Sequence, residues 1–275
     1  MAQPSLGVCS WSLQVSNIPD LVRLSSEVGA EVVQIGLGDP THGSWDEGDG
    51  FLAALKESGL ELSGTMIGFP GEDYTSPATI RQTGGFGDPA TRSERLDIFR
   101  QAVDQTAALG LRCLCSHAGF IPEDDGAERS SFLDCISEAA QYASEKDVLF
   151  TMETGQETAA LLRQTLDELK MSSLRVNFDP ANMILYDMGN PIEAIEILGP
   201  DIAHVHAKDA NPPQASGEWG AEVPLGDGSV GMAEFVAALE RAGYCGPLVV
   251  EREVGEQDER VEAIKHGISV LRSLS

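Results

Sequence analysis

Short apolar stretches rich in valine, leucine and isoleucine alternate along the chain with longer segments whose apolar residues recur every three or four positions. About eight such alternations follow one another without a linker or a change in composition, which predicts parallel strands joined by crossover helices. The predicted strands span 5–11, 31–37, 60–68, 111–119, 147–154, 173–179, 201–208 and 247–253. The predicted helices span 18–30, 51–60, 92–111, 131–147, 157–170, 191–199, 232–244 and 259–274.

Repeated strand–helix units of this kind predict a closed α/β barrel, and 275 residues is the usual size of one such domain. We therefore expect residues 1–275 to form a single (β/α)8 TIM barrel. Two segments, 68–92 and 210–230, interrupt the regular alternation after predicted strands. Long loops in a compact domain are usually functional, so we expect both to contribute to a binding site.

The charge and the apolar content exclude several kinds of partner. With 18 Lys and Arg against 44 Asp and Glu, the formal net charge is −26, which repels polyphosphates and argues against nucleic acid. No stretch approaches the ~20 apolar residues that cross a membrane, and no secretory signal pattern opens the sequence, so we expect a cytoplasmic protein without a membrane partner. The five cysteines lack metal-binding spacing, and we expect reduced thiols in the core.

Ligands of such a barrel bind at the carboxyl ends of its strands, so polar residues that close an apolar run are the informative ones. Four consecutive predicted strands end in Glu153, Asp179, His206 and Glu251. Each residue alone could instead cap the helix that follows it. Together, three carboxylates and an imidazole at one mouth would repel one another or stay unsatisfied without a cation. The set therefore predicts a mononuclear site for a divalent metal ion such as Mn, Mg, Co or Zn.

Two histidines alternate in the strand "AHVHAKD", so both side chains point to the same side of the sheet. His204 lies two residues, roughly 6 to 7 Å, deeper along the strand than His206. A single metal ion can hardly take both rings from an extended strand. We expect His206 to be the ligand and His204 to be a hydrogen-bonded core residue beneath it.

Several motifs carry a resemblance to a known family: "GFPGEDY", "TGGF", "SHAGFIP", "METGQETA", "NFDPANM", "HVHAKD", "EVPLGDG" and "AGYCGPLVVERE". In their order and spacing, over nearly the whole chain, the sequence resembles the sugar phosphate isomerase/epimerase family with the xylose isomerase-like barrel. The resemblance implies that the metal ligands of the family correspond to Glu153, Asp179, His206 and Glu251. This agrees with the set that the strand ends predict.

The resemblance also implies the chemistry: a proton moves at a carbon next to a carbonyl, through an enediolate. A cation that binds two adjacent substrate oxygens acidifies the C–H between them and stabilises the developing charge. Glu153 and Glu251 come from strands far apart around the ring, so we expect one to take the proton and the other to return it. Transfer on opposite faces gives a ketose epimerase, and transfer on one face gives an aldose–ketose isomerase. The sequence leaves both open.

Residues around the ligands are candidates for contact with a small sugar or polyol. The resemblance implies that Asn182 holds a substrate hydroxyl or supports the ligands. Lys208 and Asp209 could bind a hydroxyl, modulate the metal or form a salt bridge, and His117 and Trp11 could contact substrate or belong to the core. The predicted substrate-binding residues are Asn182, His117, Gln156, Lys208, Asp209 and Trp11.

Residues farther from the ligands have weaker signals. Trp219 could stack on a sugar or anchor its loop, Phe69 and Tyr74 are candidates for a lid, and His42 and His266 are expected at the surface. The loop "PLGDGSVG" could offer amides to a phosphate, but it holds no Lys or Arg, and turn formation is its expected role. An unphosphorylated sugar, polyol or keto acid is thus expected as readily as a sugar phosphate.

Three alternative functions stay open at this point. A keto-polyol dehydratase of the inosose type would use the same metal site and expel a β-hydroxyl from the enolate. An abasic-site endonuclease would need three zinc ions and more histidines than the five present, and the negative charge argues against it. A non-catalytic binding barrel is the remaining class. A homo-oligomer is implied by the family resemblance alone.

Overall fold

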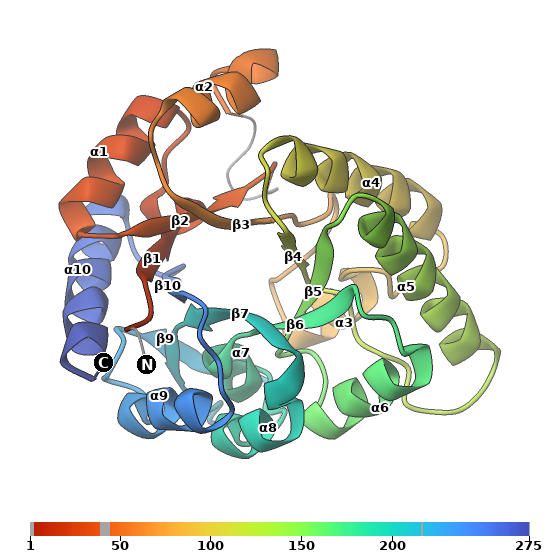
Figure 1. Ribbon diagram of the computed structural model, residues 1–275. Coiled ribbons are helices and arrows are strands. Elements are labelled where there is room, and N and C mark those ends of the chain that lie inside the picture. Colours follow the sequence, from red (N-terminus) through yellow and green to blue (C-terminus); the bar gives the residue numbers. More distant parts are fainter. Residues whose placement is uncertain (1–2, 39–44, 216, 275) are drawn as a thin grey trace.

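Eight parallel strands close into a barrel, and helices surround it on the outside (Figure 1). The computed structural model describes residues 3–38, 45–215 and 217–274. The order of strands around the barrel is β1-β10-β7-β6-β5-β4-β3-β2, so the sheet has no open edge. The predicted single (β/α)8 TIM barrel is confirmed.

The strands lie at the predicted places, although each is shorter than its apolar run. They are β1 (Leu6–Cys9), β2 (Val32–Gly36), β3 (Leu62–Met66), β4 (Cys113–Ser116), β5 (Leu149–Glu153), β6 (Leu174–Phe178), β7 (Ile202–Ala207), β8 (Asp209–Asn211), β9 (Ala221–Val223) and β10 (Leu248–Val250). The helices are α1 (Ile18–Val28), α2 (Phe51–Glu57), α3 (Pro77–Thr83), α4 (Arg92–Ala108), α5 (Ala127–Glu145), α6 (Ala159–Leu169), α7 (Pro180–Leu185), α8 (Pro191–Leu198), α9 (Met232–Arg241) and α10 (Gln257–Leu274). Short 3-10 helices are η1 (Ser10–Leu13), η2 (Gly48–Gly50) and η3 (Gly199–Asp201).

Local side-chain chemistry explains where several helices begin. Asn17, Thr158 and Asn190 precede α1, α6 and α8, and the side chain of each accepts a hydrogen bond from a backbone N–H of the first turn. Such caps satisfy amides that have no partner within the helix. A proline in the first turn of α1 and of α8 further fixes these starts, since its missing N–H costs nothing there.

Four elements were not predicted from the sequence, and all lie at the mouth of the barrel. Helix α3 lies inside the expected long loop 68–92 and starts with a capping box between Ser76 and Thr79. Helix α7 has six residues, too few for an apolar period, and follows β6 at once. Strands β8 and β9 pair antiparallel within the expected loop 210–230, with Asp209 opposite Val223.

The main core fills the layer between the barrel and the helices. Phe86, Phe99 and Phe150 pack together there, with ring centroids 4.6 to 6.5 Å apart. Phe69, expected in a lid, is instead buried against Phe86 with ring centroids 5.0 Å apart, so that expectation is wrong. Its loop folds back on the barrel because Phe69 is part of this aromatic core.

The expectation that all cysteines are core thiols is right in part. All five are free, and Cys9, Cys115 and Cys135 are buried. Cys113 is partly buried and Cys245 is exposed, because the turn after α9 lies on the outside of the barrel. No metal-binding or disulfide role follows from any of them.

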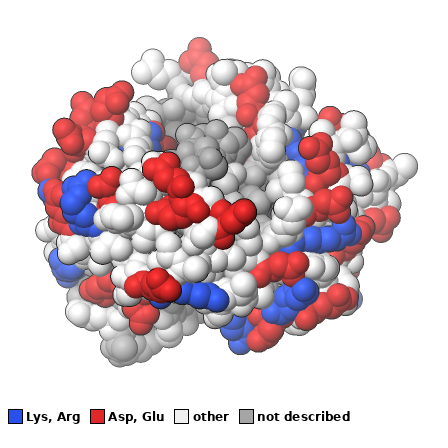
Figure 2. Space-filling model, turned by 90° about the horizontal axis from the view of Figure 1, so that it is seen from above, with Lys and Arg blue, Asp and Glu red and all other residues white. Residues whose placement is uncertain are grey.

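The excess of carboxylates in the composition is visible at the surface. Asp and Glu outnumber Lys and Arg on the face seen in Figure 2. His266 is exposed on α10, as expected, and His42 lies outside the described residues. Among the helices of the described chain, none is long and apolar enough to cross a bilayer.

Candidate metal centre

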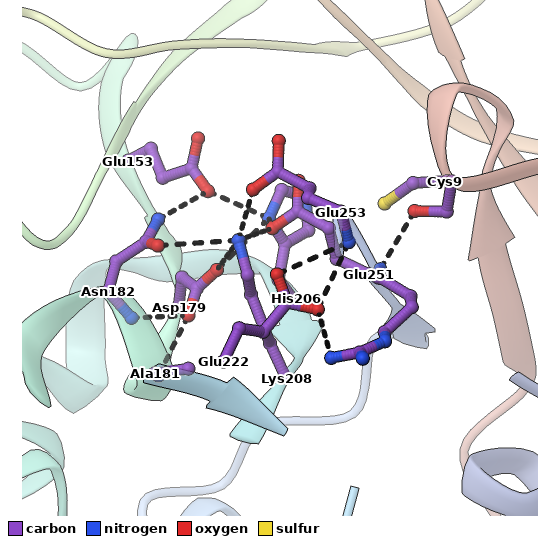
Figure 3. A network of polar contacts seen from close by, with 12 residues as sticks. Cys9, Glu153, Asp179, Ala181, Asn182, His206, Lys208, Glu222, Glu251 and Glu253 are labelled. Atoms are coloured by element: carbon purple, nitrogen blue, oxygen red, sulfur yellow. Dashed lines mark hydrogen bonds and ion pairs between the residues drawn. The ribbon is translucent and has the colours of Figure 1, made fainter. Parts of the chain in front are cut away.

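Four neighbouring strands of the barrel, β5, β6, β7 and β10, bring the predicted metal ligands together at one end. Glu153 is the last residue of β5, and His206 lies near the end of β7. Asp179 and Glu251 directly follow β6 and β10. All four are buried, and each offers a ligand atom within 4.8 Å of the others (Figure 3).

His206 lies at the centre of the group, with its Nδ1 facing the carboxylates. Nδ1 is 2.8 Å from Glu153 Oε1, 3.5 Å from Glu251 Oε2 and 3.8 Å from Asp179 Oδ2. On its other side, His206 Nε2 donates to Gln34 Oε1 at 2.7 Å. A hydrogen bond of this kind fixes the ring so that Nδ1 faces the carboxylates, where with a cation bound it would be the ligand atom.

Asp179 does two things that the sequence presented as alternatives. Its Oδ1 accepts hydrogen bonds from Ala181 N at 2.8 Å and Asn182 N at 2.9 Å, which caps helix α7. Its Oδ2 is buried and has no hydrogen-bond partner among the described residues. A buried carboxylate oxygen without a donor is costly, so Oδ2, 3.8 Å from His206 Nδ1, is a candidate ligand atom for a cation.

The second histidine of β7 lies one layer below the first and faces away from the carboxylates. His204 Nδ1 donates to Asn177 Oδ1 at 2.8 Å, and Ser63 Oγ lies 3.1 Å from Nε2. Burial lowers the pKa of His204 to about 3, so its ring is neutral. Asn177 Nδ2 in turn donates to His206 Nδ1 at 3.3 Å, and His204 thereby supports His206 through Asn177.

Glu251 is held from two sides. Trp11 Nε1 donates to its Oε1 at 2.7 Å, and Lys208 Nζ donates to its Oε2 at 2.9 Å. Burial alone would raise the pKa of Glu251, but Lys208 and His206 outweigh burial and hold it well below the usual value. Glu251 is therefore ionised at neutral pH.

Glu153 faces different partners. Its Oε1 accepts from Asn182 Nδ2 at 3.3 Å, and its Oε2 lies 3.3 Å from His117 Nε2. Cys115 Sγ is 3.8 Å from the same Oε2. The two glutamates thus flank His206 with separate supporting residues.

The donor set fits a divalent cation. Three buried carboxylates surround one imidazole nitrogen, and burial raises the pKa of Asp179 to about 6, against the opposing effect of Lys208. A cation would remove the mutual repulsion of the carboxylates and satisfy Asp179 Oδ2. Oxygen donors with one nitrogen suit Mg, Mn, Co or Zn.

A cavity of about 500 Å³ opens directly above the four residues. Its floor includes Glu153, Glu251 and Asn182. Its walls come from the segments after β3, β4, β6 and β10 and from β9 with the two residues before it. Trp219 rests edge-on against Tyr186, with ring centroids 4.7 Å apart. The lining residues are Trp11, Met66, Ile67, Gly68, Glu72, Tyr74, His117, Glu153, Asn182, Leu185, Tyr186, Trp219, Gly220, Glu222, Glu251, Glu253 and Val254.

Three of the six predicted substrate contacts line the cavity, and three do not. Trp11, His117 and Asn182 line it. Trp11 lies in η1, whereas the sequence predicted it at the end of the first strand. Gln156 is buried behind the wall, where its Nε2 donates to Tyr186 Oη at 3.5 Å. Lys208 is buried in ion pairs with Glu251 and Glu253, the salt-bridge alternative.

Asp209 has a different role from the predicted one. Its carboxylate accepts hydrogen bonds from the backbone N–H groups of Ala210, Gly226, Gly228 and Val230 at 2.9 to 3.1 Å. It is buried beneath the loop that follows β9 and is absent from the cavity lining. Its carboxylate therefore holds this loop in place, because four amide donors saturate it.

Several residues that complete the site were not predicted from the sequence. Gln34 and Asn177 orient His206, and they lie inside strands β2 and β6 where nothing distinguishes them from other polar residues. Glu253 was not predicted, although a signal was present. It follows Glu251 by two residues, and in an extended chain this spacing puts both side chains on the same side. Glu72 and Glu222 come from the two segments predicted only as loops.

The protein is a closed parallel α/β barrel. Its candidate metal-binding residues come from the carboxyl ends of neighbouring strands, where such barrels bind their substrates. The sequence matches the xylose isomerase-like TIM barrel family over residues 22–274. The chain belongs to this family.

Relatives and solved structures are similar over most of the chain. L-ribulose-5-phosphate 3-epimerase UlaE of Shigella boydii is 26% identical over 257 residues, which are 89% of this chain and 85% of the relative. A xylose isomerase domain protein from Planctomyces limnophilus is 27% identical, with a TM-score of 0.89 over 100% of this chain and 98% of its own. D-allulose 3-epimerase from Methylomonas sp., crystallised with D-allulose, shares the fold at 18% identity, a TM-score of 0.71 and coverage of 100% and 98%.

Proposed function

We propose that the protein is a divalent-metal-dependent sugar epimerase that moves a proton at a carbon next to a carbonyl. The observation that carries the proposal is the arrangement of Glu153 and Glu251. They reach the floor of one cavity from β5 and from the end of β10, on either side of His206. Relatives named as sugar epimerases support the same reaction.

Each glutamate is set up to exchange a proton with a substrate lying between them. Glu251 is ionised and held by Trp11 and Lys208, so it can accept a proton as a general base. Glu153 lies beside His117 and Asn182, which fix its direction. Removal of a proton by one glutamate and its return from the other inverts the carbon between them, whereas an isomerase would use one face.

The four ligands Glu153, Asp179, His206 and Glu251 would hold the metal ion at the cavity floor. When bound, a divalent cation supplies Lewis-acid polarisation of the substrate oxygens, which lowers the pKa of the C–H between them. Aromatic and aliphatic side chains line part of the cavity, which would limit the water that reaches the reacting carbon once a substrate is bound.

The test is solvent-deuterium exchange with a pair of ketoses that are epimers at the reacting carbon, in Mn²⁺-supplied protein. In a two-base epimerase, E153Q and E251Q each abolish epimerisation. Each retains exchange only with the epimer whose proton faces the remaining glutamate, so the two variants have opposite preferences. Metal content is measured for both, since each glutamate is also a ligand.

The exposed Glu196 on α8 provides the control, because E196Q removes a carboxylate far from the cavity. Epimerisation that survives in either active-site variant, or exchange with the same epimer in both variants, would refute the proposal. Interconversion of aldose and ketose without epimerisation would place the protein among the isomerases. Loss of water from a keto-polyol would favour the dehydratase, which stays a prediction.

A further inference from the structure

We infer that the substrate is an uncharged sugar without a phosphate group, held at its far end by aromatic side chains. The inference deepens the proposed function and rests on it. Epimerases of sugar phosphates need a cationic or amide-rich subsite for the phosphate, and the relative from Shigella boydii is named for a phosphorylated ketose. The walls of the cavity have the opposite character.

No lysine or arginine is among the described residues that line the cavity. The residues outside the described part, 1–2, 39–44, 216 and 275, include neither type in the sequence. A phosphate monoester would therefore find no side-chain cation in the wall to pair with.

The wall instead carries carboxylates above the metal ligands. Glu222 is paired with Arg252 at 2.7 Å, and Glu253 shares Lys208 with Glu251 (Figure 3). Glu72 accepts two backbone N–H groups, from Phe69 at 3.0 Å and from Gly85 at 2.7 Å. Backbone donors orient a carboxylate but leave its charge in place.

Carboxylates outnumber cations in the cavity and directly below it. The carboxylates are Glu72, Glu153, Asp179, Glu222, Glu251 and Glu253, and the cations paired with them are Lys208 and Arg252. A divalent ion would offset part of this excess. A phosphate dianion entering the cavity would be repelled, whereas a neutral sugar would not.

The loop that could have bound phosphate through its amides is already occupied. Gly226, Gly228 and Val230 direct their N–H groups at the carboxylate of Asp209, 3.0 to 3.1 Å away. This loop follows β9 in "PLGDGSVG", the segment with the glycine-rich pattern of an anion site. An internal carboxylate therefore takes the place that a substrate phosphate would need.

The outer wall suits the apolar face of a sugar. Trp219 lies between β8 and β9, Tyr186 follows α7, and Tyr74 follows β3 along the chain. Aromatic faces bind the C–H face of a sugar without requiring charge. Tyr74 is 42% exposed, so its ring is available at the rim.

The test compares L-ribulose with L-ribulose 5-phosphate, which differ only in the phosphate. Thermal unfolding of the Mn²⁺-supplied protein reports binding without turnover, because a ligand of the folded state raises the unfolding temperature. Solvent-deuterium exchange reports the reaction. We expect L-ribulose to give the larger thermal shift and at least about tenfold faster exchange, a difference that narrows as salt screens the repulsion.

A matched pair of variants tests the electrostatic cause. Val254 lies at the rim and is 51% exposed, so V254K adds a cation to the wall. Ile197 on α8 is 40% exposed and outside the lining, so I197K adds the same charge elsewhere. We expect V254K to improve exchange with L-ribulose 5-phosphate and I197K to leave the preference unchanged.

The outcomes separate this inference from the proposed function. Equal or stronger binding and exchange of L-ribulose 5-phosphate overturns the inference and leaves the epimerase proposal standing. Binding of L-ribulose without exchange supports the inference and counts against the proposed reaction. A thermal shift with neither sugar overturns the inference, because the cavity then takes no neutral ketose.

Discussion

The contact between Trp11 and Glu251 shows how one side chain outside the ligand set can set the geometry of a proposed base. The indole N–H reaches Glu251 Oε1 across 2.7 Å in a buried place, while Lys208 holds the other oxygen. A charge-assisted hydrogen bond in such surroundings is strong and directional. Trp11 lines the cavity, and in the proposed reaction it would also position Glu251 for proton transfer.

Replacement of Trp11 by phenylalanine keeps the aromatic ring and removes the N–H. A lost hydrogen bond to a charged group is worth about 1.5 to 3 kcal/mol, so we expect kcat for epimerisation to fall by about tenfold to a hundredfold. KM should change little, because the ring that lines the cavity remains. The control is W45F, which removes the indole donor to Gly36 O, away from the carboxylates. An equal fall in W45F would contradict the positioning role.

The hydrogen bonds of Asp209 lead to a prediction about the stability of the fold. D209A leaves four backbone amides without their acceptor, three of them in the loop after β9, and we expect a loss of about 3 kcal/mol or more in the free energy of unfolding. Urea denaturation measures it. Asp227 is exposed in the same loop, so D227A should cost less than about 0.5 kcal/mol. Similar losses in both variants would show that the carboxylate does not hold the loop.

At the scale of elements, the approach of the β5–α6 loop to helix α7 leaves no room for a side chain. Gly155 has φ of 137°, and a Cβ there would lie 2.5 Å from Asn182 Cβ. Asn182 donates to Glu153 and lines the cavity, so the packing of these two segments sets one wall of the site.

Replacement of Gly155 by alanine should therefore disturb the reaction as well as the fold. Backbone strain and the clash together should cost about 2 to 4 kcal/mol in unfolding free energy. Gly189 also has a positive φ, 119°, with no atom within 4 Å of an added Cβ, so G189A reports strain alone. We expect kcat/KM to fall in G155A only. A fall of equal size in G189A would remove the argument from contact with Asn182.

The barrel and the four candidate metal ligands were both predicted from short apolar runs that end in a polar residue. Residues that do not end such a run were not found in this way. Glu153 and Glu251 each close an apolar run, so strand ends were enough to find them. Gln34 and Asn177 support His206 from other strands, and strand register, which the sequence does not show, decides such contacts. Helix α7 was too short for a periodic pattern, and the amides that fix Asp209 lie up to 21 residues away.

At the scale of the whole molecule, one buried acid should make stability depend on pH. Glu157 follows β5, and burial, with a smaller contribution from Glu153, raises its pKa from 4.5 to about 8. The folded state therefore binds this proton more tightly than the unfolded chain. The resulting stability is fully present below about pH 4.5 and is lost as the pH rises to about 8.

The variant E157Q should remove this dependence. We expect wild type to lose up to about 5 kcal/mol of unfolding free energy relative to E157Q between pH 4.5 and 8, and no more above pH 8. Urea unfolding across this range gives the difference, and E196Q on the exposed face of α8 is the control. Parallel profiles of wild type and E157Q would mean that Glu157 does not titrate in this range.

The two oxygens of the Asp179 carboxylate have different roles: Oδ1 caps α7, and Oδ2 faces the candidate metal position. Cation binding and folding of α7 are then thermodynamically linked, and the linkage is reciprocal. The amides of Ala181 and Asn182 become reporters of this coupling: Mn²⁺ should slow their hydrogen exchange with solvent. A mutation that loosens α7 should in turn weaken metal affinity without altering any ligand.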